Sequence, residues 1–331
     1  MKITFFSARS YDRQYFENLN VGKHELHFLE PALNEQTAML ATGSMAVCVF
    51  VNDRCDLPVL QILKSCGVQI VALRCAGFNN VDLEAAQTLD LQLVRVPAYS
   101  PHAVAEHAVA LILTLNRKTH KAYNRVRDGN FELERLTGFN LHDKTVGVIG
   151  TGRIGSVFAG IMRGFGCRVL ASDVVENAEL SNIGVQYVSL HELLRASDII
   201  SLHCPLSPDT RHLIGHDTLA IIKPGAMIIN TGRGALIDTK AAIEALKSGR
   251  IGYLGIDVYE QEENLFFYDH SETIIRDEVI TRLMSFPNVL ITAHQAFFTD
   301  EALTEIARVT LQNLEDFEAG KPLVNRVLLA V

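Results

Sequence analysis

The 331-residue sequence lacks the features that mark several classes of protein. Its six cysteines form no CxxC pair and have no histidines at metal-ligand spacing, so we expect buried free thiols and no bound metal. The longest apolar stretch, Ala108 to Leu115, is far shorter than the roughly 20 residues that cross a bilayer. Lys and Arg number 30 against 38 Asp and Glu, with no long block of one sign, which argues against nucleic acid and anionic membranes as partners. These absences favour a soluble, cytoplasmic protein.

The sequence does contain two series of short β-branched runs that alternate with helical patterns. Such alternation predicts an α/β fold with parallel sheets, and the length suits two domains. The expected strands are residues 3–6, 47–51, 70–73 and 93–96 in the first series, and 145–149, 168–172, 198–202, 227–230, 253–256 and 289–292 in the second. Pro97 and Pro101 interrupt regular structure between the two series and mark a crossing between domains. The apolar spacing from Asp300 to Leu314 predicts a helix that returns to the first domain.

We therefore expect a discontinuous first domain, residues 1–99 plus 298–331, and a second domain of residues 100–297. The expected strand at 145–149 leads directly into the glycines Gly150, Gly152 and Gly155, and a helical pattern follows. This strand–turn–helix order predicts a dinucleotide site whose pyrophosphate meets the helix N-terminus. Asp173, 23 residues after Gly150 (173 − 150), ends the next strand, where an acid that binds ribose is expected. No Lys or Arg adjoins Asp173, so NAD is favoured over NADP.

Polar side chains follow three further strands of the second series. Arg233 comes after the strand at 227–230, Asp257 and Glu262 after 253–256, and His294 after 289–292. Ligands of doubly wound sheets bind beyond the carboxyl ends of the strands, so these side chains are expected near one site. Hydride transfer to a 2-oxoacid needs a cation for the carboxylate, a proton donor for the carbonyl oxygen, and a partner for that donor. Arg233, His294 and Glu262 are the residue types that meet those needs.

The order of these residues after a GxGxxG turn resembles the catalytic set of the D-2-hydroxyacid dehydrogenases. The resemblance extends over nearly the whole chain, through residues 73–82 (LRCAGFNNVD), 96–101 (VPAYSP), 105–107 (AEH), 203–206 (HCPL), the arginine turn, and 293–298 (AHQAFF). Residues 257–260 (DVYE), 264–267 (NLFF) and 294–297 (HQAF) resemble the D-lactate branch of this family. The resemblance implies reversible reduction of pyruvate to D-lactate with NADH, as in fermentation.

The resemblance also implies a role for each matching residue. His294 would be the general acid, Glu262 its charge partner, and Arg233 the holder of the substrate carboxylate. The implied substrate contacts are the backbone N–H groups of Ala76 and Gly77 and the side chains of Tyr99 and Phe297. The implied NAD contacts are Arg153 and Ile154 at the pyrophosphate, Asp173 at the ribose, Cys204, Pro205 and Thr210 along the cofactor, Thr231, Gly232 and Arg233 beneath the nicotinamide, and Asp257 at its carboxamide.

The family's fold would place the active site in the cleft between a Rossmann NAD-binding domain and a smaller flavodoxin-like domain. Its subunit interface would use the helical region from Ala103 to Arg127, which predicts a homodimer or homotetramer. Two alternatives remain open on the sequence. One is a D-2-hydroxyacid dehydrogenase that acts on another 2-oxoacid, and the other is a dinucleotide-sensing interaction protein without catalytic activity.

Overall fold

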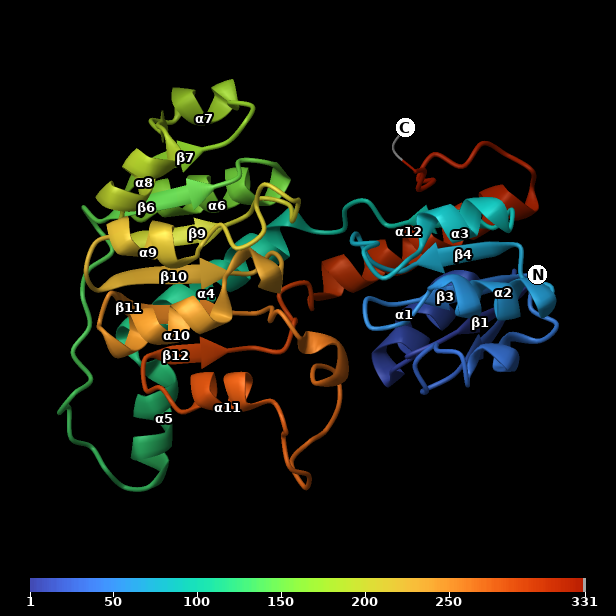
Figure 1. Cartoon of the computed structure of the whole chain (residues 1–331), viewed down its shortest axis with the longest axis horizontal. Coiled ribbons are helices and arrows are strands. Elements are labelled where there is room, and N and C mark those ends of the chain that lie inside the picture. The colour runs from blue at the N-terminus through green and yellow to red at the C-terminus, as the bar shows by residue number, and fades with distance from the viewer. Residues whose placement is uncertain (330–331) are drawn as a thin grey trace. The chain divides into compact units, whose positions relative to one another are not determined.

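The computed structural model describes residues 1–329 and divides the chain into two compact units. Unit 1 comprises Met1–Ser100 and the chain from Phe297 onward, which are the blue-to-cyan and red ends of the colour scale in Figure 1. Unit 2 is Pro101–Ala296. Each boundary differs by one residue from the expected one.

Unit 1 is built on a five-stranded parallel sheet with the order β2-β1-β3-β4-β5. Its elements are β1 (Lys2–Phe5), α1 (Ser10–Asn20), β2 (Glu25–Phe28), the 3-10 helix η1 (Ala38–Ala41), β3 (Ala46–Val49), α2 (Leu57–Ser65), β4 (Ile70–Leu73), α3 (Leu83–Thr88), β5 (Gln92–Arg95) and α12 (Asp300–Glu318). The central strands β3 and β4 are buried along their whole length, as expected for β-branched runs in a parallel sheet. Helix α12 packs on α1, β4 and β5, so the returning helix completes this unit. The strand order is that of flavodoxin-like sheets.

Strand β2 was not among the expected strands. Its four residues alternate polar Glu25 and His27 with apolar Leu26 and Phe28, and none is β-branched. The strand lies at the edge of the sheet and pairs only with β1, so its exposed side requires no continuous apolar run.

Unit 2 contains a seven-stranded parallel sheet with the order β12-β11-β10-β9-β6-β7-β8. Its strands are β6 (Thr145–Ile149), β7 (Arg168–Ser172), β8 (Gln186–Tyr187), β9 (Ile199–Leu202), β10 (Ala226–Asn230), β11 (Ile251–Ile256) and β12 (Val289–Ile291). Its helices are α4 (Pro101–Arg117), α5 (Thr119–Arg127), α6 (Arg153–Gly164), α7 (Ala178–Asn182), α8 (Leu190–Ala196), α9 (His216–Ile221), η2 (Gly234–Leu236), α10 (Thr239–Lys247), η3 (Glu262–Asn264) and α11 (Glu278–Met284). Among the strands of unit 2, only the two-residue β8 was not expected from the sequence. Counted from β6, the order is 3-2-1-4-5-6 with a seventh strand added, which is the Rossmann order, and the expected fold class is confirmed.

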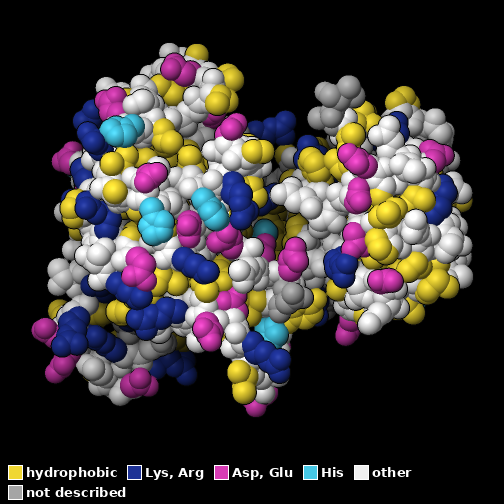
Figure 2. All heavy atoms as spheres, viewed as in Figure 1, with side chains coloured by type: hydrophobic (Ala, Val, Ile, Leu, Met, Phe, Trp, Pro, Cys, Tyr) yellow, Lys and Arg dark blue, Asp and Glu magenta, His cyan; other side chains and the backbone are white. Residues whose placement is uncertain are grey.

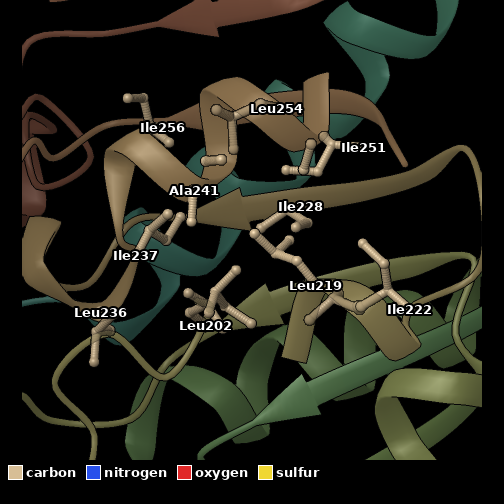
Figure 3. Close-up of a cluster of buried hydrophobic side chains, with 14 of the residues drawn as sticks. Leu202, Leu219, Ile222, Ile228, Leu236, Ile237, Ala241, Ile251, Leu254 and Ile256 are labelled. Atoms are coloured by element: carbon tan, nitrogen blue, oxygen red, sulfur yellow. The ribbon is translucent and has the colours of Figure 1, made fainter. Parts of the chain in front are cut away.

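Alternate residues of the unit 2 strands face two separate apolar cores, one on each side of the sheet. Figure 3 shows one of them, in which Ile228 on β10 and Leu254 on β11 pack with α9 and α10. The other core joins α4 and α6 to the opposite faces of the same strands, for example through Met227 and Ile229. Both faces are covered, so only the ends of the strands are open to ligands.

The surface and the cysteines agree with the composition. On the face shown in Figure 2, basic and acidic side chains are interspersed rather than gathered in one large patch. All six cysteines are free thiols, five of them buried and Cys204 half-buried. Within residues 1–329, no helix has the length and apolar character needed to cross a membrane.

Candidate active site

The glycine-rich turn joins the carboxyl end of β6 to the start of α6. Gly150 has a φ of +90°, and a Cβ there would lie 2.5 Å from the backbone nitrogen of Cys204. A Cβ on Gly155 would lie 1.9 Å from the carbonyl oxygen of Gly150, so neither position tolerates a side chain. Gly152, at the N-terminus of α6, has nothing within 4 Å of its Cβ position. The turn therefore packs tightly against the segment that follows β9, while the N-terminus of α6 stays open to an anion.

Arg153 and Ile154 form the first turn of α6, next to this opening. Arg153 is exposed and Ile154 half-buried, so the guanidinium can reach a bound phosphate while the aliphatic side chain packs on the core beside α6.

Asp173 follows β7 and is held by the glycine turn itself. Its Oδ2 accepts hydrogen bonds from the backbone N–H and hydroxyl of Thr151, and its Oδ1 accepts one from the N–H of Val174 at 2.6 Å. Burial raises the pKa of Asp173, but these hydrogen bonds outweigh burial and lower it overall. The Tyr187 hydroxyl, 2.9 Å from Thr151 Oγ1, steadies this arrangement from β8. Asp173 thus presents a carboxylate beside the glycine turn.

The loop after β9 carries Cys204, Pro205 and Thr210. The Thr210 hydroxyl donates to the carbonyl oxygen of Pro205 at 2.6 Å and accepts from the N–H of Ser207 at 2.7 Å, which fixes the loop. Burial raises the pKa of Cys204 to about 11, so its side chain is a neutral thiol. His203, before this loop, stacks on Phe158 with ring centroids 4.9 Å apart.

The arginine turn follows β10 and is organised by Asn230. The Asn230 side chain accepts from the N–H of Gly232 at 3.0 Å and donates to the carbonyl oxygen of Arg233 at 2.9 Å. The Arg233 side chain is half-buried. The hydroxyl of Thr231 is buried and has no hydrogen-bond partner among the described residues. An unpaired buried hydroxyl at the carboxyl end of a strand is a ready contact for a ligand.

The arginine turn also contacts the loop that carries Glu262. A Cβ on Gly234 would lie 2.1 Å from the backbone carbon of Tyr259, so the two segments pack backbone against backbone. In that loop, Glu262 Oε2 accepts the N–H of Tyr259 at 2.9 Å, and this bond fixes the orientation of the carboxylate.

His294 and Glu262 form a direct pair. His294 Nδ1 lies 2.7 Å from Glu262 Oε1, and the two side chains are 18% and 22% exposed. His294 has a φ of +51°, a left-handed conformation that turns its side chain out of the run of β12. Because Nδ1 is occupied by the carboxylate, Nε2 is the ring nitrogen left to exchange a proton with a substrate.

Asp257 organises the segment that carries His294. Its carboxylate is fully buried and accepts from the Thr292 hydroxyl, from the N–H of Gln295 at 2.9 Å and from the N–H of Ala296 at 2.8 Å. Its backbone carbonyl accepts the N–H of His294 at 2.7 Å. Both carboxylate oxygens are thus engaged by the protein's own donors, and the expected contact with a carboxamide remains a prediction.

His107 on α4 extends this network. Its Nε2 lies 3.0 Å from Thr292 Oγ1 and 3.4 Å from Asp257 Oδ1. Since Thr292 donates its proton to Asp257, His107 must be the donor to Thr292. The network therefore ties helix α4 to the end of β12.

In unit 1, the two expected pocket residues lie together and a third ring joins them. The ring centroid of Phe297 is 6.2 Å from that of Tyr99 and 5.8 Å from that of Phe50. Phe50 follows β3, and the guanidinium of the buried Arg74 lies over its ring at 5.0 Å. Nothing in the motifs indicated Phe50, because an aromatic residue after a strand is ordinarily core.

Ala76 and Gly77 lie in the loop after β4 and are half-buried. Within residues 1–329, the backbone N–H of neither residue donates a hydrogen bond to the protein. Two successive free N–H groups at the carboxyl end of a strand can bind an anion.

Some of the expected site residues, or the loops that carry them, contact each other directly. His294 and Glu262 share a hydrogen bond, Asp257 holds the His294 segment, and the Arg233 turn packs on the Glu262 loop through Gly234. Sequence reasoning did not identify Thr151 and Tyr187, which hold Asp173. A Thr inside the glycine turn is a weak indication, in the sequence, of a contact with Asp173, whereas a Tyr on a two-residue strand gives no such indication.

Comparisons with known proteins identify the family of the chain. Residues 109–296 match the family model described as D-isomer specific 2-hydroxyacid dehydrogenase, NAD binding domain. The D-lactate dehydrogenase of Escherichia coli (strain K12) is 53% identical over 329 residues, which cover 99% of this chain and 100% of that protein. The chain belongs to the D-2-hydroxyacid dehydrogenase family.

Solved structures of this family also resemble the chain over its length. The apo-structure of D-lactate dehydrogenase from Escherichia coli matches 99% of this chain and 100% of its own, with a TM-score of 0.92 and 51% identity. The NAD-complexed D-isomer specific 2-hydroxyacid dehydrogenase from Lactobacillus delbrueckii ssp. bulgaricus has the same coverage, with a TM-score of 0.80 and 31% identity. Unit 2 is accordingly the NAD-binding domain of the family.

Proposed function

We propose that this protein is an NAD-dependent D-lactate dehydrogenase, which reduces pyruvate to D-lactate and catalyses the reverse reaction. The observation that carries the proposal is the His294–Glu262 pair at the carboxyl edge of the NAD-binding sheet. The 53% identity to a D-lactate dehydrogenase over nearly the full chain supports the choice of pyruvate.

In this proposal, His294 moves the proton. Its Nε2 donates a proton to the carbonyl oxygen of pyruvate during reduction and accepts one from the hydroxyl of D-lactate during oxidation. Glu262 contacts Nδ1 and so holds the ring in one orientation. The Asp257 carboxylate holds the His294 segment in place by accepting the N–H groups of Gln295 and Ala296.

The substrate carboxylate is held by Arg233 and by the backbone N–H groups of Ala76 and Gly77. A guanidinium forms paired hydrogen bonds with a carboxylate, and free N–H groups add further donors. Tyr99 and Phe297 limit the substrate side chain to a small group, because their rings occupy the space that a longer chain needs.

The residues of unit 2 fit NAD. The open N-terminus of α6 at Gly152 suits the pyrophosphate, together with Arg153 and Ile154, and the Asp173 carboxylate suits a ribose diol. When bound, NADH supplies the hydride that reduces the carbonyl carbon. Cys204, Pro205 and Thr210 would line the cofactor, and Thr231, Gly232 and Asp257 would lie at its nicotinamide end. The unpaired Thr231 hydroxyl supports this placement.

We also propose that the protein is a homodimer or a larger homo-oligomer that uses the region of α5. No residue of α5 is buried in the single chain, and Tyr123 and Val126 are exposed on it. Phe131 and Leu133, in the following segment, are 75% and 80% exposed. Exposed apolar side chains gathered in one region mark an interaction surface. Sedimentation at micromolar concentration should give at least the dimer mass, and a stable monomer would contradict this proposal.

The free cysteines suit the reducing cytoplasm, where we place the protein.

The proposed activity is tested by NADH oxidation with pyruvate and a series of longer 2-oxoacids, followed by chiral analysis of the product. The proposal predicts the highest kcat/KM with pyruvate and D-lactate as the product. A preference for a longer 2-oxoacid would assign another substrate within the family. Tight NADH binding without turnover of any 2-oxoacid would favour a dinucleotide-sensing interaction protein.

A further inference from the structure

The loop after β4 presents the two free N–H groups of Ala76 and Gly77, and its shape is fixed from the neighbouring strand. The N–H of Val96 donates to the carbonyl oxygen of Cys75 at 3.2 Å. Arg95, the last residue of β5, reaches over with its side chain and donates from Nη1 to the carbonyl oxygen of Ala76 at 2.8 Å. The Arg95 guanidinium also lies over the ring of Phe78 at 5.0 Å.

Arg95 is itself held firmly by the chain around it. Its N–H donates to the carbonyl oxygen of Asn325 at 3.1 Å, and its carbonyl oxygen accepts from the Asn313 side chain at 3.0 Å. Within residues 1–329, no carboxylate forms an ion pair with the Arg95 guanidinium. The side chain therefore brings an uncompensated positive charge to the Ala76 carbonyl oxygen.

The geometry of the peptide bond gives this contact a consequence for the substrate. The carbonyl oxygen of Ala76 and the N–H of Gly77 belong to one trans peptide unit, so they point in opposite directions. A donor that fixes the oxygen on one side fixes the direction of the N–H on the other. The positive charge also polarises the unit, which makes the N–H a stronger donor.

We propose that Arg95 is a positioning residue for substrate binding: it orients and polarises the Ala76–Gly77 peptide so that the Gly77 N–H binds the substrate carboxylate. This inference rests on the proposed function, which makes that N–H a substrate contact. Arg95 differs from Arg233 because it acts through the backbone and does not itself touch the substrate.

The test uses Arg95→Met and Arg95→Lys in the full-length protein. Arg95→Met keeps an extended apolar side chain but loses the bond to the Ala76 carbonyl oxygen. We expect the KM for pyruvate to rise roughly ten- to hundredfold, the range for one lost charge-assisted hydrogen bond, while kcat changes much less. Oxamate, an unreactive analogue that keeps the carboxylate, should bind the NADH-loaded enzyme more weakly by a similar factor. Arg95→Lys should restore part of the loss, because an ammonium can still donate to the carbonyl oxygen.

The matched control is Arg13→Met. Arg13 also lies over a phenylalanine ring, that of Phe28 at 4.8 Å, and forms an exposed ion pair with Glu17 on α1. The Arg13→Met variant should have the wild-type KM for pyruvate, oxamate binding and NADH affinity. In Arg95→Met, NADH affinity should stay at the wild-type value, and the thermal midpoint should fall by only a few degrees, as for one lost hydrogen bond within the protein.

Two results would overturn the inference. One is an unchanged KM and unchanged oxamate binding in Arg95→Met. The other is a parallel loss of oxamate binding, NADH affinity and thermal stability that Arg95→Lys does not repair, which would make Arg95 a residue of general stability. Direct binding of oxamate separates this inference from the proposed function. A wild-type protein that binds oxamate without reducing pyruvate, and loses that binding in Arg95→Met, would refute only the proposed function.

Discussion

Replacing Asp257 by Asn tests whether this carboxylate organises the His294 segment. The carboxylate is fully buried, and its Oδ2 faces the N–H of Ala296 at 2.8 Å. In the asparagine variant, the amide oxygen can keep the bonds at the Oδ1 position, but the NH2 group then meets the Ala296 N–H, so two donors face each other. An unsatisfied buried donor costs about 1–3 kcal/mol, and the remaining bonds lose the assistance of a charge.

We therefore expect Asp257→Asn to lower the free energy of unfolding by about 2–4 kcal/mol, or roughly 4–16 °C in the thermal midpoint for a domain of this size. Because His294 is carried by the same segment, kcat/KM for pyruvate should fall as well, by about a hundredfold if the imidazole shifts by about 1 Å.

The assay combines thermal denaturation without cofactor, NADH affinity and pyruvate kinetics. The control is Asp82→Asn, where the side chain caps α3 by accepting the N–H of Ala85 at 2.9 Å. Asparagine caps helices as well as aspartate does, so stability and activity should not change. If Asp257 acted only as a contact for the carboxamide, Asp257→Asn would weaken NADH binding and leave the cofactor-free thermal midpoint unaltered. That result would refute the reasoning.

Three further predictions concern the cofactor, the pocket and acid stability. NADH should be used much better than NADPH, because the Asp173 carboxylate repels a 2′-phosphate. Hydrogen bonds to this carboxylate outweigh burial and keep its pKa low, so it is charged. Equal kcat/KM values for the two cofactors would contradict this prediction. Tyr99→Ala or Phe297→Ala should shift the ratio of pyruvate to 2-oxobutyrate turnover by roughly tenfold to a few hundredfold, and an unchanged ratio in both would remove these rings from the pocket. Burial lowers the pKa of His203 from 6.5 to about 3. As the pH drops, His203 is therefore protonated in the unfolded chain before it is protonated in the folded chain. The free energy of unfolding is fully retained above pH 6.5 and falls below that pH. The loss of free energy of unfolding should reach about 2 kcal/mol at pH 5, measured by urea titration. A His203→Asn variant whose stability depends on pH as in the wild type would exclude His203 as the cause.

The sequence was sufficient to predict the parts of the fold that carry strong apolar runs. The strand from Ile70 to Leu73 is buried, as is the strand from Thr145 to Ile149 except for its first residue, and both were placed correctly because burial on both faces requires continuous apolar residues. The edge strands from Glu25 to Phe28 and from Gln186 to Tyr187 were missed, because a short, half-exposed strand needs no such run. Position at the edge of a sheet is decided by tertiary contacts that local sequence does not encode.

The same distinction applies to the site. Motif spacing identified His294 and Glu262, which the fold brings within 2.7 Å of each other. It did not indicate that Asp257 would be enclosed by donors from the His294 segment, or that Arg95 would reach the Ala76 carbonyl oxygen. Those contacts join residues 38 and 19 positions apart and depend on loop conformations. Spacing locates the ends of strands, whereas the paths of the loops beyond them come only from the folded chain.

The central claim is that His294 exchanges the proton and that Glu262 holds the imidazole in position for that exchange. The most direct measurement is kcat/KM for pyruvate from about pH 5.5 to 9 in wild type, Glu262→Gln and His294→Gln. Glu262→Gln should lower reduction, because the amide replaces the charged hydrogen-bond partner that lies 2.7 Å from His294 Nδ1. His294→Gln should depress reduction at every pH. A Glu262→Gln variant as active as the wild type at every pH, or substantial pyruvate reduction by His294→Gln, would contradict the account.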